Sequence, residues 1–171
     1  VGCLAAQPST TKEVLPKAAP KPGVTVSEQA AAEAPSYPRV DCAISYSVAL
    51  EWPQKPASVA WGQMPGVTVD AQDNVWIFTR AEPPVQVYSP QGKFLKSWGT
   101  GLIKKAHQIK LDAEGHVWLA DVGAHTVLKC TQEGKVLLTL GTPGMKGADE
   151  AHFWLPTDMA FVRNGDVLVS D

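Results

Sequence analysis

The chain has 171 residues, of which 15 are Lys or Arg and 17 are Asp or Glu, so its formal net charge is −2. This balance speaks against nucleic acid as a partner, because binding to phosphates requires a basic surface. Apolar residues make up 44% of the chain, as in ordinary globular proteins, and no run of about 18 or more apolar residues exists that could span a membrane as a helix.

Residues 1–40 are expected to form a tether. The stretch from residue 4 to residue 38 is rich in Ala, Pro, Lys, Glu and Ser and has almost no large apolar side chains. It cannot bury enough surface to offset its conformational entropy. We therefore expect a disordered, semi-extended linker, followed by a folded domain over residues 41–171.

Val1, Gly2 and Cys3 precede this linker. A small residue followed by Cys and a polar linker resembles the end of a bacterial lipoprotein signal, in which the Cys is lipidated. This interpretation predicts an extracytoplasmic protein, in the periplasm or at the cell surface, whose only membrane contact is through acyl chains on Cys3. The alternative is an accidental Gly-Cys pair.

A repeat of about 42 residues occupies most of the remaining chain. Residues 65–99 align without a gap to residues 107–141, an offset of 107 − 65 = 42. A third copy begins at Thr157 and matches the second at an offset of 157 − 107 = 50. The additional residues fall in the loop 142–156.

Each copy follows the same pattern of strands and turns. An alternating apolar strand is followed by a turn with Asp, Asn or Gly, a strand with Val-Trp, a third strand, a Gly hairpin and a fourth strand. Four antiparallel strands in a repeat of this length are typical of a β-propeller blade. We predict an all-β protein with about two and a half blades. Closed propellers have about four to eight blades, which predicts that the chain is the N-terminal part of a longer propeller.

Positions at which the copies differ are candidates for function, since the blade itself explains the shared ones. His107 starts an innermost strand, where the other copies have Pro65 and Thr157, and innermost strands line the central channel. Arg80 follows a second strand, where the second copy has Val122. A lone His is often structural and a surface Arg is commonplace; the alternative is a binding or catalytic site at the channel mouth.

His125, in a strand or turn, and His152, in the long loop, are further candidates. Cys42 and Cys130 would form a disulfide only if the fold brings them together, and the alternative is two buried free thiols.

Two segments resemble signatures of a known family. Residues 121–129 (DVGAHTVLK) resemble the D-V-x-x-H-Q-V-x-K signature of peptidyl-α-hydroxyglycine α-amidating lyases and their bacterial NHL relatives. Residues 152–158 (HFWLPTD) are similar to the H-F-x-x-P-T-D segment of the same family. The resemblance covers residues 60–171, and it departs from the family at Thr126, where Gln is common.

The resemblance implies an NHL-type propeller, six-bladed at full length, that cleaves a peptidyl-α-hydroxyglycine to a peptide amide and glyoxylate. It implies a zinc ion with His107 as one of three histidine ligands, and Arg80 as the arginine that binds the substrate carboxylate. It also implies that Val67 and Ile109 give backbone carbonyls to a calcium ion. The other zinc ligands and the catalytic tyrosine would lie beyond Asp171, so this segment alone is expected to be inactive.

Two functions remain open. The first is a lyase that acts on a peptide or small-molecule substrate. The second is a non-catalytic, extracytoplasmic NHL propeller that binds a peptide, a glycan or a protein partner, because fold does not determine function. The chain also departs from the family around the candidate zinc ligand, because the family usually has Pro-His-Gly where this chain has Ala106, His107 and Gln108.

Overall fold

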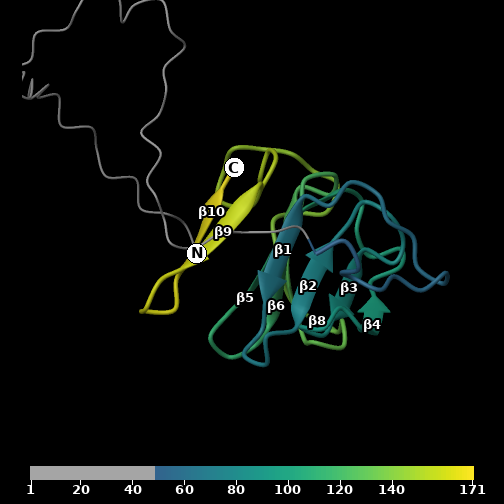
Figure 1. Ribbon diagram of the computed structural model, residues 1–171. Coiled ribbons are helices and arrows are strands. Elements are labelled where there is room, and N and C mark those ends of the chain that lie inside the picture. Colours follow the sequence, from purple (N-terminus) through teal and green to yellow (C-terminus); the bar gives the residue numbers. More distant parts are fainter. Residues whose placement is uncertain (1–48) are drawn as a thin grey trace, which may run out of the picture. The chain divides into compact units, whose positions relative to one another are not determined.

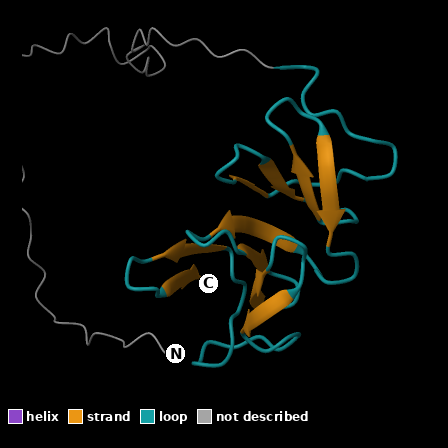
Figure 2. Cartoon of the chain, turned by 90° about the horizontal axis from the view of Figure 1, so that it is seen from below, coloured by secondary structure: helices purple, strands orange, loops and turns teal. Residues whose placement is uncertain are grey.

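The computed structural model describes residues 49–171, and residues 1–48, with the expected linker, Cys3 and Cys42, lie outside the described part. The described residues form ten β-strands joined by turns and loops (Figure 2). They include no helix, and therefore none long and apolar enough to cross a membrane. The all-β class expected from the repeat is confirmed.

The first two repeat copies each fold into a four-stranded antiparallel sheet whose strands follow chain order. The first sheet, seen in Figure 1, consists of β1 (Gly66–Val69), β2 (Val75–Phe78), β3 (Val85–Tyr88) and β4 (Phe94–Trp98). The second consists of β5 (Ala106–Leu111), β6 (Val117–Asp121), β7 (Thr126–Cys130) and β8 (Val136–Leu140). Such four-stranded units are propeller blades. Their β-branched and aromatic residues suit a pleated, half-buried surface.

The third copy contributes the antiparallel pair β9 (Asp158–Phe161) and β10 (Val167–Ser170), drawn in yellow in Figure 1. This pair corresponds to the first two strands of a blade. Its turn is closed by a hydrogen bond from the Val162 N–H to the Asp166 carbonyl, 2.9 Å long. The described residues thus form two blades and the first half of a third, as the repeat predicts.

The core lies between neighbouring blades. One apolar cluster joins the first and second blades and includes Trp76, Phe78, Val85, Val87, Ile109, Val117, Leu119 and Leu128. A second cluster joins the second and third blades and includes Trp118, Ala120, Val127 and Met159. Ile109 and Met159 are buried, whereas Val67, at the same repeat position in the first blade, is 63% exposed. Each blade therefore covers one face of the next.

The glycines of the two predicted hairpins are required by both conformation and packing. Gly92 and Gly134 have φ values of 82° and 88°, in the left-handed region that other residues rarely adopt. A Cβ atom would lie 2.7 Å from the Trp52 ring at Gly92 and 2.7 Å from the Trp98 ring at Gly134. Each hairpin can therefore pack against its tryptophan ring only if the residue at this position is glycine.

A hydrogen bond between an aspartate and a tryptophan closes the first turn of each complete blade. The Trp Nε1–H donates to the Asp Oδ2 over 2.9 Å in both Asp70–Trp76 and Asp112–Trp118. The third copy has Val162 and Leu168 at these positions, so both members of the pair change together. An acceptor stabilises a buried indole N–H, and the third copy retains neither member of the pair.

We expect Asp112 to make stability depend on pH. Burial acts to raise the pKa of Asp112, but hydrogen bonds from Trp118 and the His116 N–H, together with Lys129, outweigh it and lower the pKa from 3.8 to about 2. The folded-state pKa is below the unfolded value, so the stabilisation is present above pH 4 and is lost as pH falls from 3.8 towards 2. Asp112→Asn should lower the free energy of unfolding at neutral pH by about 2 kcal/mol, measured by urea denaturation.

The matched control is Asp73→Asn, in an exposed turn where φ is 61° and Asn is tolerated. It should leave the urea midpoint unchanged. Equal effects of the two variants at neutral pH, or an Asp112→Asn effect that persists undiminished at pH 2, would contradict this account of Asp112.

Candidate active site

His107 lies in a β-bulge at the start of β5. Ala106 pairs with Asp121 and Gln108 pairs with Ala120, so His107 has no partner in the ladder. An additional residue of this kind bends a strand and redirects a side chain. The His107 Nδ1 lies 2.7 Å from the Thr157 carbonyl oxygen, where the third blade begins. Because a carbonyl only accepts, Nδ1 carries the proton of the neutral ring, and the lone pair is then on Nε2.

Arg80 is held next to His107 by both blades. Its Nε donates to the Ala106 carbonyl over 3.1 Å. Its Nη1 donates to the Gln63 side-chain oxygen, and its backbone N–H donates to the Gln63 carbonyl over 2.8 Å. Arg80 makes no hydrogen bond through Nη2 with the described residues, so that side of the guanidinium is available to an anion. The structure therefore brings together two of the site residues predicted from the sequence.

Asp121 holds the loop that leads into His107, and sequence reasoning did not single out this role. Its buried carboxylate accepts four backbone N–H groups at 2.7–3.1 Å, from Lys104, Lys105, Gly123 and Ala124. Thr79 and Asp171, at the same repeat position, each accept two backbone N–H groups in the same way. Thr79, Asp121 and Asp171 stand at the same position of the repeat, and this correspondence could have revealed their shared role from the sequence.

The carbonyls of Val67 and Ile109 face away from their blades' second strands. The turn bonds from Asp70 N–H to the Asn74 carbonyl and from Asp112 N–H to the His116 carbonyl set the alternation of hydrogen-bonded pairs. Val67 and Ile109 then fall in non-hydrogen-bonded pairs, so their C=O groups point to the free inner edge. Their placement fits oxygen donors to a hard cation, although calcium takes about six to eight oxygens and these supply two.

Of the zinc ligands that the resemblance implies, the described residues include His107, and one histidine does not make a zinc site. The one group of three metal-capable side chains among residues 49–171 is Asp112, Glu114 and His116, on the turn after β5. The Lys129 ammonium lies 3.1 Å from Asp112 and 3.6 Å from Glu114. This group therefore already surrounds a cation of the protein's own.

The other two candidate histidines hold the connection between the second and third blades. The Nδ1 of His125 bonds to the Trp154 carbonyl, and the Nδ1 of His152 lies 2.7 Å from Asp149 Oδ1. Cys130 is a free, buried thiol whose pKa burial raises to about 11. Cys42, the candidate partner for a disulfide, lies outside the described residues.

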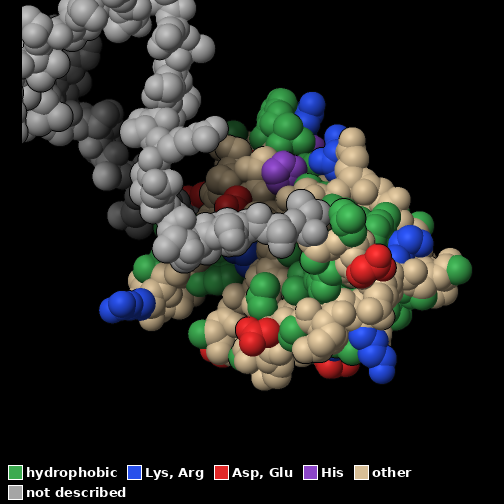
Figure 3. All heavy atoms as spheres, viewed as in Figure 1, with side chains coloured by type: hydrophobic (Ala, Val, Ile, Leu, Met, Phe, Trp, Pro, Cys, Tyr) green, Lys and Arg blue, Asp and Glu red, His purple; other side chains and the backbone are tan. Residues whose placement is uncertain are grey.

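Basic and acidic side chains are interspersed over the face shown in Figure 3. The electrostatic field over that face therefore has no single sign.

Comparison with known proteins identifies relatives of the chain. It is 35% identical over 88 residues to a probable peptidyl-α-hydroxyglycine α-amidating lyase of Caenorhabditis elegans, covering 51% of this chain and 25% of that protein. It is 31% identical over 140 residues to the human NHL repeat-containing protein 3, covering 75% and 40%. Virginiamycin B lyase from Staphylococcus aureus superimposes with a TM-score of 0.47 at 21% identity, covering 63% of this chain and 34% of that one. No family model matches.

The fold is that of a β-propeller of the NHL type. The chain is homologous to peptidyl-α-hydroxyglycine α-amidating lyases and to NHL-repeat proteins. It spans a quarter of the length of the lyase relative and two fifths of the NHL relative.

Removal of the Asp121 carboxylate should destabilise the loop that leads into His107. Asp121→Ala leaves four backbone N–H groups without their acceptor, and each buried unsatisfied donor costs about 1–3 kcal/mol. We expect the free energy of unfolding to fall by at least about 3 kcal/mol in urea denaturation. Glu150→Ala, at an exposed loop carboxylate, is the control and should leave the midpoint nearly unchanged. A small effect at Asp121 would mean that water replaces its hydrogen bonds.

Proposed function

We propose that this segment contributes Arg80 and His107 to the active site of a peptidyl-α-hydroxyglycine lyase. The supporting observation is the Arg80–Ala106 hydrogen bond, which fixes the guanidinium against the residue that precedes His107. The Arg80 guanidinium suits an anion, and the His107 ring has a free lone pair on Nε2. A substrate with a carboxylate beside a hydroxyl-bearing carbon requires this combination.

The reaction breaks the bond between the amide nitrogen and the hydroxyl-bearing carbon. The hydroxyl proton leaves, the carbonyl of glyoxylate forms, and the nitrogen gains a proton to give the peptide amide. Arg80 would bind the carboxylate through Nη2 and fix the orientation of the substrate. His107 would hold zinc through Nε2, and zinc would supply Lewis-acid polarisation of the hydroxyl. The Thr157 carbonyl would keep Nδ1 protonated, as carbonyls do for other metal-binding histidines.

The remaining zinc ligands, a catalytic tyrosine and any calcium-binding oxygens beyond Val67 and Ile109 would come from outside residues 49–171. The proposed activity therefore belongs to the whole protein and not to this segment alone.

A second candidate is a non-catalytic propeller that binds a peptide, a glycan or a protein. Gln108 favours it, because this side chain stands directly beside His107 and lies against the first blade. Its Oε1 would be 2.8 Å from a Cβ at Gly66. A large side chain there narrows the space between the two innermost strands.

The test is made on the full-length protein with a peptidyl-α-hydroxyglycine substrate. Arg80→Ala should raise KM and lower kcat/KM by about 100-fold or more, because a charge-assisted contact is lost. Lys105→Ala, at an exposed residue of the loop that leads into His107, is the control. His107→Ala should lose bound zinc, measured by mass spectrometry of the metal. A wild-type protein that binds substrate analogue without turnover, or zinc retained in His107→Ala, would favour the binding function.

We also propose that Cys3 is lipidated and anchors the protein outside the cytoplasm. This rests on the sequence alone, since Cys3 lies outside the described residues. Palmitate labelling of the full-length protein in a bacterial host should be lost in Cys3→Ser and kept in Cys42→Ser. Equal labelling of both variants would exclude Cys3 as the acceptor.

A further inference from the structure

The Lys110 ammonium in the second blade binds the innermost strand of the third. Its Nζ lies 2.5 Å from the Met159 carbonyl oxygen and 2.8 Å from Asp158 Oδ1. The Lys110 side chain is 33% exposed, so the ammonium is partly withdrawn from water. Charge-assisted contacts of this kind are stronger when water is partly excluded.

Met159 stands at the repeat position of Val67 and Ile109. The turn bond between Val162 and Asp166 sets the pairing of β9 with β10, and Met159 faces Val169 in a non-hydrogen-bonded pair. Its C=O and N–H therefore point to the free inner edge of the strand. The carbonyl that Lys110 binds thus belongs to the same row as the carbonyls of Val67 and Ile109.

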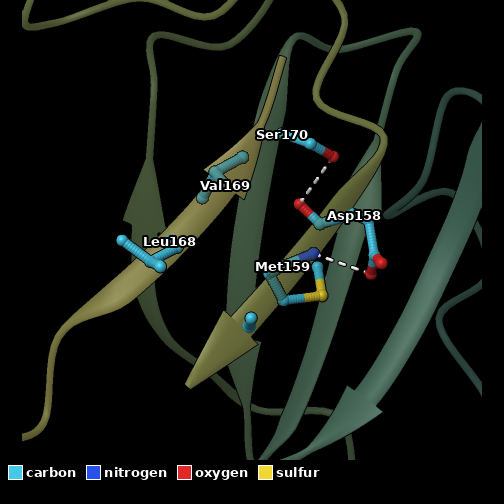
Figure 4. Close-up of a pocket in the computed structure, with 6 residues that line it drawn as sticks. Asp158, Met159, Leu168, Val169 and Ser170 are labelled. Carbon is cyan, nitrogen blue, oxygen red and sulfur yellow. Dashed lines mark hydrogen bonds between the residues drawn. The ribbon is translucent and has the colours of Figure 1, made fainter. Parts of the chain in front are cut away.

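The inner-edge N–H groups in this row are also satisfied locally. The Met159 N–H donates to Asp158 Oδ1 over 2.8 Å, as Figure 4 shows, and the Ile109 N–H donates to Gln108 Oε1 over 3.1 Å. Gln108 and Asp158 occupy the same repeat position, 50 residues apart. The third blade therefore has both of its inner-edge groups at Met159 satisfied by side chains of this chain.

Lys110 is specific to the second copy. The corresponding residues are Thr68 in the first copy and Ala160 in the third, and neither side chain can carry a positive charge. Burial acts to raise the pKa of Asp158, but hydrogen bonds from Lys110 and the Met159 N–H outweigh it and hold that pKa below its usual value. The carboxylate is thus negative when the ammonium binds it.

We propose that Lys110 is a built-in cation that joins the inner edges of the second and third blades, so that this junction needs no metal ion. The ammonium already occupies the Met159 carbonyl, and a divalent cation at that carbonyl would have to displace it. Calcium could then take only the Val67 and Ile109 carbonyls of this row. The proposal stands whether or not the whole protein is a lyase.

The test compares thermal unfolding of the chain with millimolar calcium and with a chelator. With the chelator no calcium contributes to any variant, so the effect of Lys110 is measured there by itself. Lys110→Met keeps the length of the side chain and removes its charge, and it should lower the midpoint by about 4–8 °C. Lys135→Met, in an exposed hairpin of the same blade, is the matched control and should leave the midpoint unchanged. Lys110→Arg retains a cation and should recover most of the loss.

Calcium that stabilises Lys110→Met but not the wild type would support the proposal further, because the ion would replace the missing charge. The proposal is overturned if calcium raises the wild-type midpoint more than it raises the midpoint of Lys110→Met. It is also overturned if Lys110→Met unfolds at the same temperature as Lys135→Met.

Discussion

The innermost strand of each blade has one edge with no neighbouring strand, and the rest of the structure depends on how that edge is satisfied. Backbone N–H and C=O groups need partners wherever water is restricted. In the second and third blades the N–H groups are bound by Gln108 and Asp158, and the Met159 carbonyl is bound by Lys110. The free edge is thus both a structural requirement and a set of oxygens that can bind a cation.

Contacts between neighbouring blades place polar side chains at this inner edge. Apolar clusters between the sheets fix the position of each blade against the next. Polar contacts at the inner ends then cross the same junctions: Arg80 to the Ala106 carbonyl, and His107 to the Thr157 carbonyl. Two residues that lie 107 − 80 = 27 positions apart in the sequence therefore come together without belonging to a common turn or strand.

The strands could be predicted from the sequence because the same pattern of strands and turns occurs in three copies. The positions of Val67 and Ile109 on the inner strands followed from the same alignment. The surroundings of His107 could not be predicted, because its bulge and its bond to Thr157 depend on how two blades meet. The role of Lys110 was missed for the same reason: its partners are about 50 residues away in another blade, and a lysine in an alternating strand usually indicates a solvent-facing position.

The central claim is that the junction of the second and third blades orients His107 with Nδ1–H on the Thr157 carbonyl and Nε2 free. Nitrogen-15 chemical shifts of the neutral His107 ring in the metal-free protein test it most directly. The account predicts a single tautomer protonated at Nδ1, and the same state in Arg80→Ala. A ring protonated at Nε2, or one that averages between both tautomers, would contradict it.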